Sequence, residues 1–390
     1  MRLAPSFSAI ASALLLAACS GGSGDGVGTA NANATEAPGG SAAAGRPFRI
    51  EPIGTFNQPW AMASLWNGAM LITQRGGELK FRTADGALLD VAGVPRVDAG
   101  GQGGLGDIVL HPNFRQNAMV YLSWVESGEG PTLGAVVGRA RFIRTEDGAG
   151  LHGLEVIWRQ SPKVTGRGHF GHRLAFGPDG LLYITNGDRQ KFEPAQDQAQ
   201  HLGKIVRLRD DGSTPPDNPW ASRGGITAQL WTTGHRNPLG LAFDSSGRLW
   251  EHEMGPEGGD EFNLIERGAN YGYPIVSNGS HYGGRDIPDH STRPEFRAPL
   301  ISWNPSVSPA GLMIYSGRLF PQWRGDAFMG ALSGQSLLRI DLDGARARQG
   351  DRWPMGARIR EVEEGPDGAI YLLEDGPSGR LLRLTPGTRS

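Results

Sequence analysis

The chain has 390 residues, and its 60 glycines and 27 prolines exclude a bundle of long helices. Hydrophobic residues make up 38% of the sequence and charged residues 20%, which is typical of a folded protein with a sizeable core rather than of a disordered chain. The formal net charge is -2, and no basic stripe or acidic run marks a nucleic-acid binder, so we expect no nucleic-acid partner.

The N-terminus has the pattern of an export signal. Arg2 precedes an apolar stretch, residues 7–18, that is too short to span a bilayer but suits the core of a signal peptide. The stretch ends in Leu16-Ala17-Ala18-Cys19, which is similar to the lipobox of bacterial lipoproteins. We therefore expect residues 1–18 to be removed and Cys19 to carry a lipid anchor on the periplasmic side of a bacterial membrane. An ordinary signal peptide followed by an unmodified cysteine is the alternative.

Cysteine content also limits the possible sites. Because Cys19 is the only cysteine, a disulfide framework and a multi-cysteine zinc site are excluded, and any metal must be bound by oxygen or imidazole. Residues 19–46 are rich in glycine, serine and alanine and nearly free of large apolar side chains, which predicts a flexible tether. Residues 47–390 are the predicted folded body, which suits a single closed all-β architecture.

One pattern recurs along this body: an apolar run, a turn rich in polar residues and usually glycine, and a short alternating apolar stretch. It predicts β-hairpins. The turns are about 60 residues apart on average, which is longer than the roughly 40 to 50 residues of a propeller blade with short loops. The six predicted turns are residues 66–68, 115–117, 178–180, 245–247, 323–325 and 366–368.

The stretches that follow these turns are predicted to be the inner strands, most clearly at residues 181–185, 249–252 and 369–373. The predicted fold is all-β: a six-bladed β-propeller with four-stranded antiparallel blades and loops inserted on one face. A pair of β-sandwiches is the alternative, because a strand pattern alone does not establish radial closure.

Two histidines, His169 and His172, lie in a glycine-rich segment just before a predicted strand. On a helix this spacing would let them share a metal, but the neighbouring glycines disfavour a stable helix. In a loop, one imidazole can instead approach a ligand as a general base, because imidazole titrates near neutral pH. A surface loop whose histidines only form hydrogen bonds is the alternative.

Charged residues cluster in two other places. Residues 251–261 hold five carboxylates in a glycine-rich segment, a donor set that suits Ca²⁺, although a solvated acidic loop has the same composition. Arg358 and Arg360 are two residues apart on a predicted strand, so both side chains lie on the same face. They could therefore bind one carboxylated ligand together. A solvated strand edge is the alternative for this pair.

Several motifs along residues 52–384 occur in the order found in one family. They are residues 101–107 with His111-Pro112, 168–171 with Arg173-Leu174, Gly187-Asp188-Arg189, 195–197 with 201–205, 234–238, 255–256 with 259–261 and 270–272, and Arg358-Ile359-Arg360. In these motifs the body resembles the PQQ-dependent soluble aldose sugar dehydrogenases. These are six-bladed propellers that bind pyrroloquinoline quinone (PQQ) and Ca²⁺ and oxidise aldoses to lactones.

The resemblance implies a role for each matching residue. His169 is implied to be the general base that takes the proton from the anomeric hydroxyl, and Asp188 the carboxylate that orients it. Arg236 is implied to stabilise the negative charge that develops on the reduced quinone. The residues implied to contact PQQ are Gln102, Arg236, Asn237, Arg358 and Arg360.

The resemblance also implies two calcium sites. The backbone carbonyls of Gly255 and Pro256 are implied to bind the Ca²⁺ that also binds the cofactor. Glu261 and the carbonyl of Tyr271 are implied to bind a second, structural Ca²⁺. The implied partners are an aldose substrate, a respiratory electron acceptor and, through the lipid anchor, a membrane.

Two residues depart from the family pattern. Ser333 stands where the family often has a cofactor-contacting lysine, so one positive charge is missing, and Met254 stands where a polar residue commonly precedes the Gly-Pro pair. Two other functions are compatible with a propeller. One is a metal-dependent lactone hydrolase, which would use carboxylate and asparagine ligands and no arginine pair. The other is a non-enzymatic lipoprotein scaffold that binds a protein or glycan.

Overall fold

Strands make up nearly all of the regular structure. The chain divides into two units, residues 1–42 and 43–390, and the computed structural model describes residues 45–146 and 148–387. The predicted signal peptide, Cys19 and nearly all of the predicted tether lie outside the described residues. The all-β prediction is confirmed. Helical segments in the described ranges are α1 (Phe114–Asn117) and the 3-10 turns η1 (Glu193–Ala195), η2 (Ala221–Arg223), η3 (Thr227–Gln229), η4 (His290–Thr292) and η5 (Pro321–Trp323).

Three of the sheets are four-stranded and antiparallel, with their strands in sequence order. The first contains β11 (Gly171–Phe176), β12 (Leu182–Asn186), β13 (Lys204–Leu208) and β14 (Leu230–Thr233). The second contains β15 (Pro238–Phe243), β16 (Leu249–Glu253), β17 (Asp260–Ile265) and β18 (Ile301–Trp303). The third contains β19 (Pro309–Ile314), β20 (Ala327–Ala331), β21 (Ser336–Asp343) and β22 (Arg346–Pro354).

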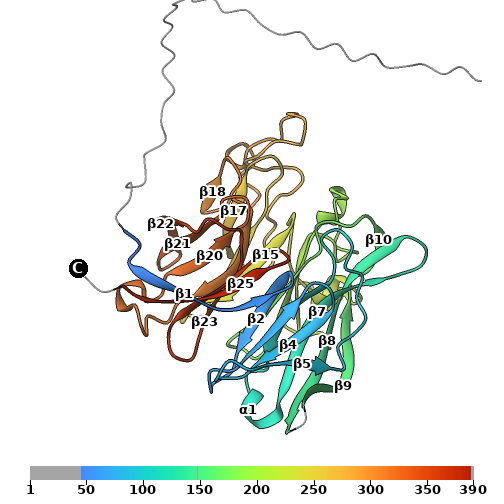
Figure 1. Ribbon diagram of the computed structural model, residues 1–390. Helices are drawn as coiled ribbons and strands as arrows, with labels where there is room; N and C mark the ends of the chain where they lie inside the picture. Colours follow the sequence, from blue (N-terminus) through green and yellow to red (C-terminus); the bar gives the residue numbers. More distant parts are fainter. Residues whose placement is uncertain (1–44, 147, 388–390) are drawn as a thin grey trace, which may run out of the picture. The chain divides into compact units, whose positions relative to one another are not determined.

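A fourth sheet joins the two ends of the described chain. Its order is β1 (Phe48–Phe56), β25 (Gly379–Pro386), β24 (Ile370–Glu374) and β23 (Ile359–Glu364). Figure 1 shows β1, in blue, beside β25, in red. The pairing is antiparallel and runs from Phe48 opposite Pro386 to Phe56 opposite Gly379. An early strand therefore completes the sheet formed by the last three strands, which ties the beginning of the body to its end.

The remaining sheet has nine strands and differs from the prediction of purely antiparallel pairing. Two antiparallel groups of four are joined by a short parallel contact, in which Val91 and Ala92 of β5 pair with Ala149 and Gly150 of β9. β8 and β9 are long, at 14 and 12 residues, so β9 reaches the neighbouring group. The strands are β2 (Pro59–Ser64), β3 (Met70–Gln74), β4 (Glu78–Arg82), β5 (Leu88–Ala92), β6 (Leu105–Leu110), β7 (Met119–Ser127), β8 (Thr132–Thr145), β9 (Gly148–Arg159) and β10 (Val164–Thr165).

The first strand of each four-stranded group lies against the first strand of the next. β2 packs against β6, β6 against β11, β11 against β15, β15 against β19, and β19 against β23. β23 then packs against β2, so the series of contacts is closed. Such a ring of sheets around a centre is the arrangement of a β-propeller.

Every predicted turn joins the first strand of a group to its second strand. Residues 178–180 lie between β11 and β12, and residues 366–368 lie between β23 and β24. Residues 115–117 differ from a simple turn, because they form α1 between β6 and β7. The stretches after the turns are therefore the second strands, and the innermost strands are the apolar runs that precede the turns.

The hydrophobic core lies between neighbouring sheets. Trp250 and Phe262 from one sheet pack with Met329 and Leu338 from the next, and all four side chains are fully buried. Burial of apolar surface against both neighbours therefore holds each sheet in place.

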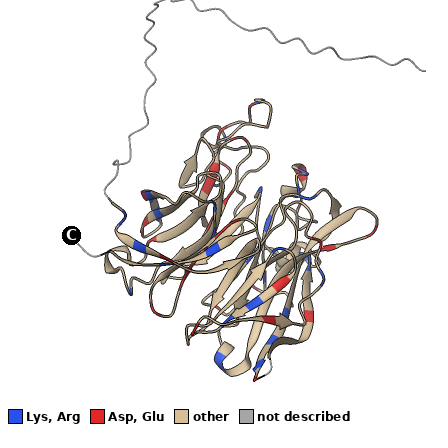
Figure 2. Cartoon of the chain, viewed as in Figure 1, with Lys and Arg blue, Asp and Glu red and all other residues tan. Residues whose placement is uncertain are grey.

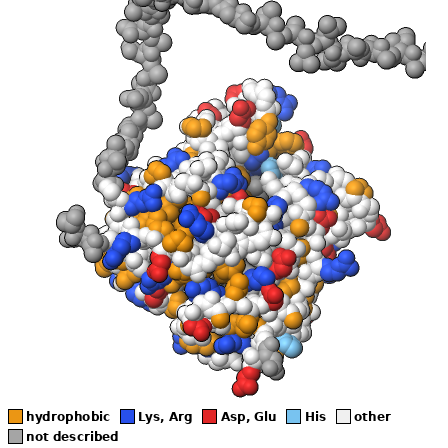
Figure 3. Space-filling view, viewed as in Figure 1, with side chains coloured by type: hydrophobic (Ala, Val, Ile, Leu, Met, Phe, Trp, Pro, Cys, Tyr) orange, Lys and Arg blue, Asp and Glu red, His pale blue; other side chains and the backbone are white. Residues whose placement is uncertain are grey.

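Charges of both signs are spread over the described body. Figure 2 shows basic and acidic residues scattered among the strands and loops, and the face in Figure 3 has both signs interspersed with apolar patches. Within residues 45–146 and 148–387, none of the helices is long and apolar enough to cross a membrane.

Candidate active site

A cavity of about 380 Å³ lies at one end of the innermost strands. Its wall is built mainly from residues that immediately precede or begin these strands, which is why segments far apart in the sequence meet there. The lining includes Gln102 before β6, His172 in β11, Asn237 before β15, Ser308 before β19, and Arg358 and Arg360 at the start of β23.

His169 lies in the loop before β11, and a buried arginine holds that loop. Arg189 is fully buried and donates hydrogen bonds to the carbonyls of Gly168 (2.9 Å), Gly166 (2.5 Å) and Leu133 (2.8 Å). His169 itself has a φ of +50°, a conformation that is uncommon for a residue with a side chain. The fixed loop therefore determines where the imidazole points, and strained backbone of this kind is frequent at functional sites.

The imidazole of His169 is paired with Asp188, which follows β12. Nδ1 of His169 lies 2.7 Å from Oδ1 of Asp188, and Asp188 is fully buried. A carboxylate in this position fixes the proton on Nδ1 and leaves Nε2 as the nitrogen that can accept a proton. Burial lowers the pKa of His169 below its ordinary value of 6.5, and the hydrogen bond to Asp188 opposes that shift. The ring is therefore neutral, and able to act as a base, at neutral pH.

Gln102 and Arg236 are connected to this pair through the backbone. Oε1 of Gln102 accepts a hydrogen bond from the backbone N–H of His169 at 2.7 Å. The backbone N–H of Asp188 donates to the carbonyl of Arg236 at 2.8 Å. The structure thus brings together the four residues that the sequence predicted around the reacting atoms.

Arg236 and Asn237 precede β15 and are held by Glu253, the last residue of β16. One carboxylate oxygen of Glu253 accepts hydrogen bonds from the backbone N–H groups of both residues. Two of their buried side-chain atoms, Nε of Arg236 and Oδ1 of Asn237, have no hydrogen-bond partner among the described residues. Unpaired polar atoms of this kind are expensive unless a ligand or water satisfies them, so they indicate a ligand.

Arg358 and Arg360 both face Asp375, which follows β24. Nε of Arg358 lies 2.8 Å from Oδ2 of Asp375, and Nη2 of Arg360 lies 3.1 Å from Oδ1. All three residues line the cavity. The predicted pair therefore forms one cationic wall, which Asp375 orients. Asp375 was not predicted from the sequence, because a single aspartate after a strand has no distinguishing pattern.

Other lining residues were also missed by sequence reasoning. Arg75 follows β3 and lines the cavity while donating from Nε to Oε1 of Gln58 at 2.9 Å. It adds a positive charge that no motif indicated. Ser333, which replaces the lysine of the family pattern, lies beside the lining residue Ser308, with the two Oγ atoms 2.8 Å apart. Positive charge in the cavity thus comes from arginines alone.

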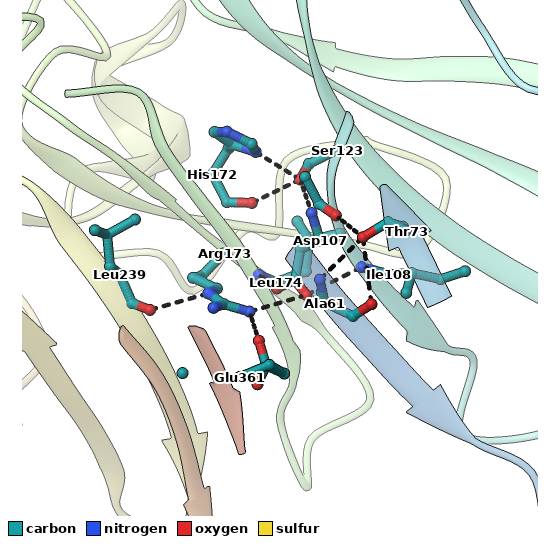
Figure 4. Close-up of polar contacts among 12 residues, drawn as sticks. Ala61, Thr73, Asp107, Ile108, Ser123, His172, Arg173, Leu174, Leu239 and Glu361 are labelled. Carbon is teal, nitrogen blue, oxygen red and sulfur yellow. Dashed lines mark hydrogen bonds and ion pairs between the residues drawn. The ribbon is translucent and has the colours of Figure 1, made fainter. Parts of the chain in front are cut away.

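The floor of the cavity rests on a buried polar network (Figure 4). Arg173 pairs with Glu361 and with Asp107, and its Nε donates to the carbonyl of Leu239 at 2.9 Å. Its guanidinium lies 4.0 Å from the ring centroid of Trp60. These contacts join β6, β11, β15 and β23, so they hold four of the innermost strands in a fixed relation beneath the cavity.

His172, three residues after His169, forms part of this floor rather than of the reacting pair. Its ring stacks on Trp60, with centroids 5.1 Å apart and planes 15° apart, and its Nδ1 lies 2.8 Å from Oγ of Ser123 (Figure 4). Burial lowers the pKa of His172 to about 3, so the ring stays neutral. The two histidines therefore have different surroundings, and nothing in the geometry makes them a metal pair.

The Gly255-Pro256 segment passes close to Arg236. The guanidinium of Arg236 donates to the carbonyls of Met254 (2.8 Å) and Gly255 (2.5 Å), and Asp260 accepts from the N–H of Gly255 at 2.9 Å. A Cβ on Gly255 would lie 2.3 Å from the carbonyl oxygens of Gly258 and Gly259. A side chain at residue 255 would therefore collide with the backbone, so only glycine fits there.

A second group of acidic residues is buried on β16 and β17. Nδ2 of Asn263 bridges the carboxylates of Glu251 (3.0 Å) and Glu261 (3.1 Å). Ligand atoms of Glu251, Glu253 and His235 lie within 4.8 Å of one another. Oε1 of Glu251 and Oδ1 of Asn263 have no hydrogen-bond partner among the described residues. Burial raises the pKa of Glu251 and of Glu261, and a hydrogen bond from His290 opposes the shift at Glu261.

Tyr271 lies beside this acidic group. Its ring stacks on His235 with centroids 4.7 Å apart, and Nδ1 of His235 lies 3.1 Å from Oε1 of Glu253. The structure thus places the two predicted ligands, Glu261 and Tyr271, in one region. It adds Glu251 as a third buried carboxylate, which the sequence indicated only through the density of acidic residues. The predicted lipidation site, Cys19, lies outside the described residues.

The fold and this site define a class of protein, a sugar oxidoreductase built on a β-propeller. The family profile "Glucose / Sorbosone dehydrogenase" matches residues 56–383. The chain is 39% identical over 339 residues to aldose sugar dehydrogenase YliI of Escherichia coli, covering 85% of this chain and 90% of that protein. It is 28% identical to quinoprotein glucose dehydrogenase B of Acinetobacter calcoaceticus, covering 83% and 84% of the two chains.

Solved structures agree with these sequence relatives. The apo form of the soluble aldose sugar dehydrogenase of Escherichia coli has a TM-score of 0.81 at 38% identity, covering 87% of this chain and 100% of that chain. The PQQ-bound aldose sugar dehydrogenase of Streptomyces coelicolor has a TM-score of 0.70 at 28% identity, covering 87% and 98%. The chain belongs to the glucose/sorbosone dehydrogenase family, as the sequence predicted.

Proposed function

We propose that this protein oxidises aldose sugars at the anomeric carbon to lactones, and that it depends on PQQ and Ca²⁺. The observation that supports this most strongly is the position of the His169–Asp188 pair beside a cavity with a wall of arginines. A general base and a site for a carboxylated cofactor are the two elements that such an oxidation requires. The relatives, an aldose sugar dehydrogenase and a PQQ-bound homologue, point to the same reaction.

The residues present fit PQQ, which carries three carboxyl groups. Arg358 and Arg360 would bind carboxylates, and Asn237 and Arg236 offer the unpartnered atoms Oδ1 and Nε. Gln102 would lie at the edge of the cofactor next to His169. When bound, PQQ supplies a hydride acceptor, and a Ca²⁺ bound to it polarises the accepting carbonyl.

The chain's own residues would manage the proton and the developing charge. His169 would take the proton of the anomeric hydroxyl at Nε2, while the carbon-bound hydrogen leaves as hydride. Asp188 would keep Nδ1 protonated and stabilise the imidazolium that forms. The guanidinium of Arg236 would stabilise negative charge on the acceptor side of the site. The sugar is thereby oxidised by two electrons and released as a lactone.

Two cation sites belong to this proposal. The carbonyls of Gly255 and Pro256 would bind the Ca²⁺ near the cofactor. The Gly255 carbonyl would then contact the ion in place of its hydrogen bond from Arg236. Glu261 and the carbonyl of Tyr271 would bind the second. Glu251 and Asn263 would extend its ligand set through their unpartnered oxygens.

The cavity favours this reaction over the lactone hydrolase. A hydrolase of that kind would need carboxylate and asparagine ligands around one catalytic ion and no arginine pair. The cavity is instead lined by three arginines, Arg75, Arg358 and Arg360, and by one carboxylate, Asp375. Such a positive wall suits an anionic cofactor better than a catalytic cation.

We also propose that the propeller has six blades. The nine-stranded sheet would contribute two of them, because it consists of two four-stranded antiparallel groups joined only by the β5–β9 contact. The closed series of contacts between innermost strands supports this count. A crystal structure at high resolution would test it directly.

For the N-terminal part we propose export, cleavage before Cys19 and lipid attachment, which would hold residues 47–390 on the periplasmic side of a membrane, near a respiratory electron acceptor. Labelling of cells with a radioactive fatty acid tests this. The wild-type protein should be labelled and sediment with membranes, whereas Cys19→Ser should lose the label. A labelled Cys19→Ser protein would contradict the proposal.

The reaction itself is tested by product analysis. Protein supplied with PQQ, Ca²⁺ and glucose should convert the sugar to its lactone, detected by NMR, as an electron-accepting dye is reduced. Formation of any other product, or hydrolysis of an added lactone without dye reduction, would contradict the proposed reaction.

A further inference from the structure

Lys204, the first residue of β13, is a buried cation outside the cavity described above. Its side chain is fully buried. Its ammonium donates three hydrogen bonds to backbone carbonyls, those of Leu202 (2.6 Å), Pro194 (2.7 Å) and Ala195 (2.9 Å). Because a charge removed from water is expensive unless it is hydrogen-bonded, these three contacts explain how a lysine is accommodated there.

The lysine is protonated under the conditions in which the proposed base titrates. Burial lowers the pKa of Lys204 to about 7, and the charge of Asp197 opposes the shift. The pKa of His169 lies below 6.5, so Lys204 carries its proton while His169 gains one. The charged form has three N–H donors, which matches the number of carbonyls around it.

The three carbonyls belong to the connection between β12 and β13, which begins near the residue that orients the base. Pro194 and Ala195 are the last residues of the short turn η1. Just before this turn, the backbone N–H of Phe192 donates to Oδ2 of Asp188 at 3.2 Å, while Oδ1 of the same carboxylate contacts His169. One end of η1 is thus attached to the carboxylate and the other end to the ammonium.

The backbone of this connection needs such contacts to keep its conformation. Arg189, Gln190 and Phe192 have φ values of +56°, +60° and +65°, which are uncommon for residues with a side chain. Strained backbone of this kind persists only where the surrounding structure holds it. The side chain of Arg189 holds the beginning of the segment through the loop of His169, and Lys204 holds its end.

Lys204 is also linked to the segment that carries Arg236. The carbonyl of Ala195 accepts a second hydrogen bond, from the N–H of Gly234 at 3.0 Å. Gly234 is two residues before Arg236, whose carbonyl accepts from the backbone N–H of Asp188 at 2.8 Å. The ammonium therefore supports Asp188 from two directions.

We propose that Lys204 is a positioning residue for the reaction, because its three hydrogen bonds fix the segment that places Asp188 against His169. Without the ammonium, three buried carbonyls would lack donors and the segment would shift to satisfy them. Asp188 would then contact His169 less closely, and the imidazole would lose part of the interaction that raises its pKa. This inference rests on the proposed function only for the role of His169 as the base.

An NMR titration from pH 4 to 8 tests the inference without turnover. With ¹³C-labelled histidine, the signal that is lost in His169→Gln identifies His169. In Lys204→Met the pKa of His169 should lie about 0.5 to 1 pH unit below that of the wild type, and Asp188→Asn should lower it further. Lys204→Gln keeps two N–H donors and should give a smaller decrease. Lys80→Met, which removes a lysine paired with Asp90 in a different sheet, is the matched control and should give the wild-type value.

The outcomes separate a positioning role from a purely structural one. A folded Lys204→Met protein with the wild-type pKa at His169, or an equal decrease in Lys80→Met, would overturn the inference. If Lys204→Met does not fold, Lys204→Gln decides by the same measurement: an unchanged pKa overturns the role and a lowered one supports it. A lowered pKa supports the role even if no sugar is oxidised, since the absence of oxidation counts against the proposed reaction.

Discussion

Nδ1 of His169 and Oδ1 of Asp188 lie 2.7 Å apart, with the carboxylate fully buried and the imidazole nearly so. The contact joins the loop before β11 to the loop after β12, so the sheet itself sets the orientation of the ring. Because Asp188 also accepts hydrogen bonds from the backbone of residues 190 and 192, its position does not depend on His169. The base is therefore oriented before a substrate arrives.

The first prediction concerns this pair. His169→Gln should reduce kcat by about 10² to 10⁴, because a general base contributes that much, while PQQ binding stays unchanged. In the wild type, kcat/KM should fall as pH is lowered through the pKa of His169, which burial places below 6.5. Asp188→Asn should move this limb to lower pH, because the carboxylate raises that pKa. Steady-state rates from pH 4 to 8 measure all three effects.

Two results would contradict this role. Unchanged turnover in His169→Gln would remove the residue from the reaction. His172→Gln is the matched control, since His172 packs against Trp60 and does not contact Asp188. A larger loss of kcat in His172→Gln than in His169→Gln would show that His169 is not the general base.

The second prediction concerns the arginine wall. Arg360→Ala should raise the dissociation constant for PQQ by about 10- to 100-fold, because charge-assisted hydrogen bonds to carboxylates are lost. Fluorescence titration with PQQ measures this change without turnover. Arg346→Ala, which removes an exposed arginine paired with Asp343, should leave the affinity unchanged. Equal affinity in Arg360→Ala and the wild type would exclude Arg360 from the cofactor site.

The third prediction concerns the buried acidic group. Ca²⁺ should raise the melting temperature of the wild type by several degrees, because an ion that binds only the folded state stabilises it. Glu261→Ala should have a lower melting temperature in Ca²⁺, partly restored at high Ca²⁺ concentration. Glu257→Gln changes an exposed residue of the same segment and should behave like the wild type. A calcium-independent melting curve for the wild type would contradict the structural site.

The fourth prediction concerns pH and stability. His201 is buried, its Nδ1 accepts a hydrogen bond from the N–H of Ser161, and burial lowers its pKa to about 4. Between pH 6.5 and 4 the unfolded state binds a proton at His201 that the folded state does not, so stability falls as pH falls. From pH 7.5 to 4.5 the wild type should lose about 2 kcal/mol relative to His201→Gln.

Denaturant unfolding at the two pH values measures this difference. His152→Gln, at an exposed histidine, is the matched control and should follow the wild type. A constant difference in unfolding free energy between the wild type and His201→Gln across this range would contradict the buried neutral ring.

Much of the fold follows from local sequence patterns. The Pro-Asp-Gly turns at residues 178–180 and 366–368 were predictable because glycine adopts the positive φ that each turn requires. The pairing of Phe48 with Pro386 was not predictable, because it depends on closure of the whole ring. The β5–β9 contact was missed for a related reason, since it depends on how far β9 extends.

The site residues likewise divide into those that the sequence predicted and those that it did not. The roles of His169, Asp188 and Arg236 were implied by the resemblance to the family, because each residue lies in a motif that matches the family pattern. Arg75 and Asp375 are single residues after ordinary strands, and only the ring brings them to the cavity. The aromatic residues Phe192, Tyr273 and Tyr282, which line a smaller cavity beside His169, were missed because they come from two separate connections, β12 to β13 and β17 to β18.

Reconstitution of the chelator-treated protein tests the central claim most directly. PQQ and Ca²⁺ would be added separately and together, and dye reduction would be followed with a panel of aldoses. The account predicts turnover only when PQQ, Ca²⁺ and an aldose are all present. No turnover under any of these conditions, with no spectral or thermal shift on addition of PQQ, would contradict it.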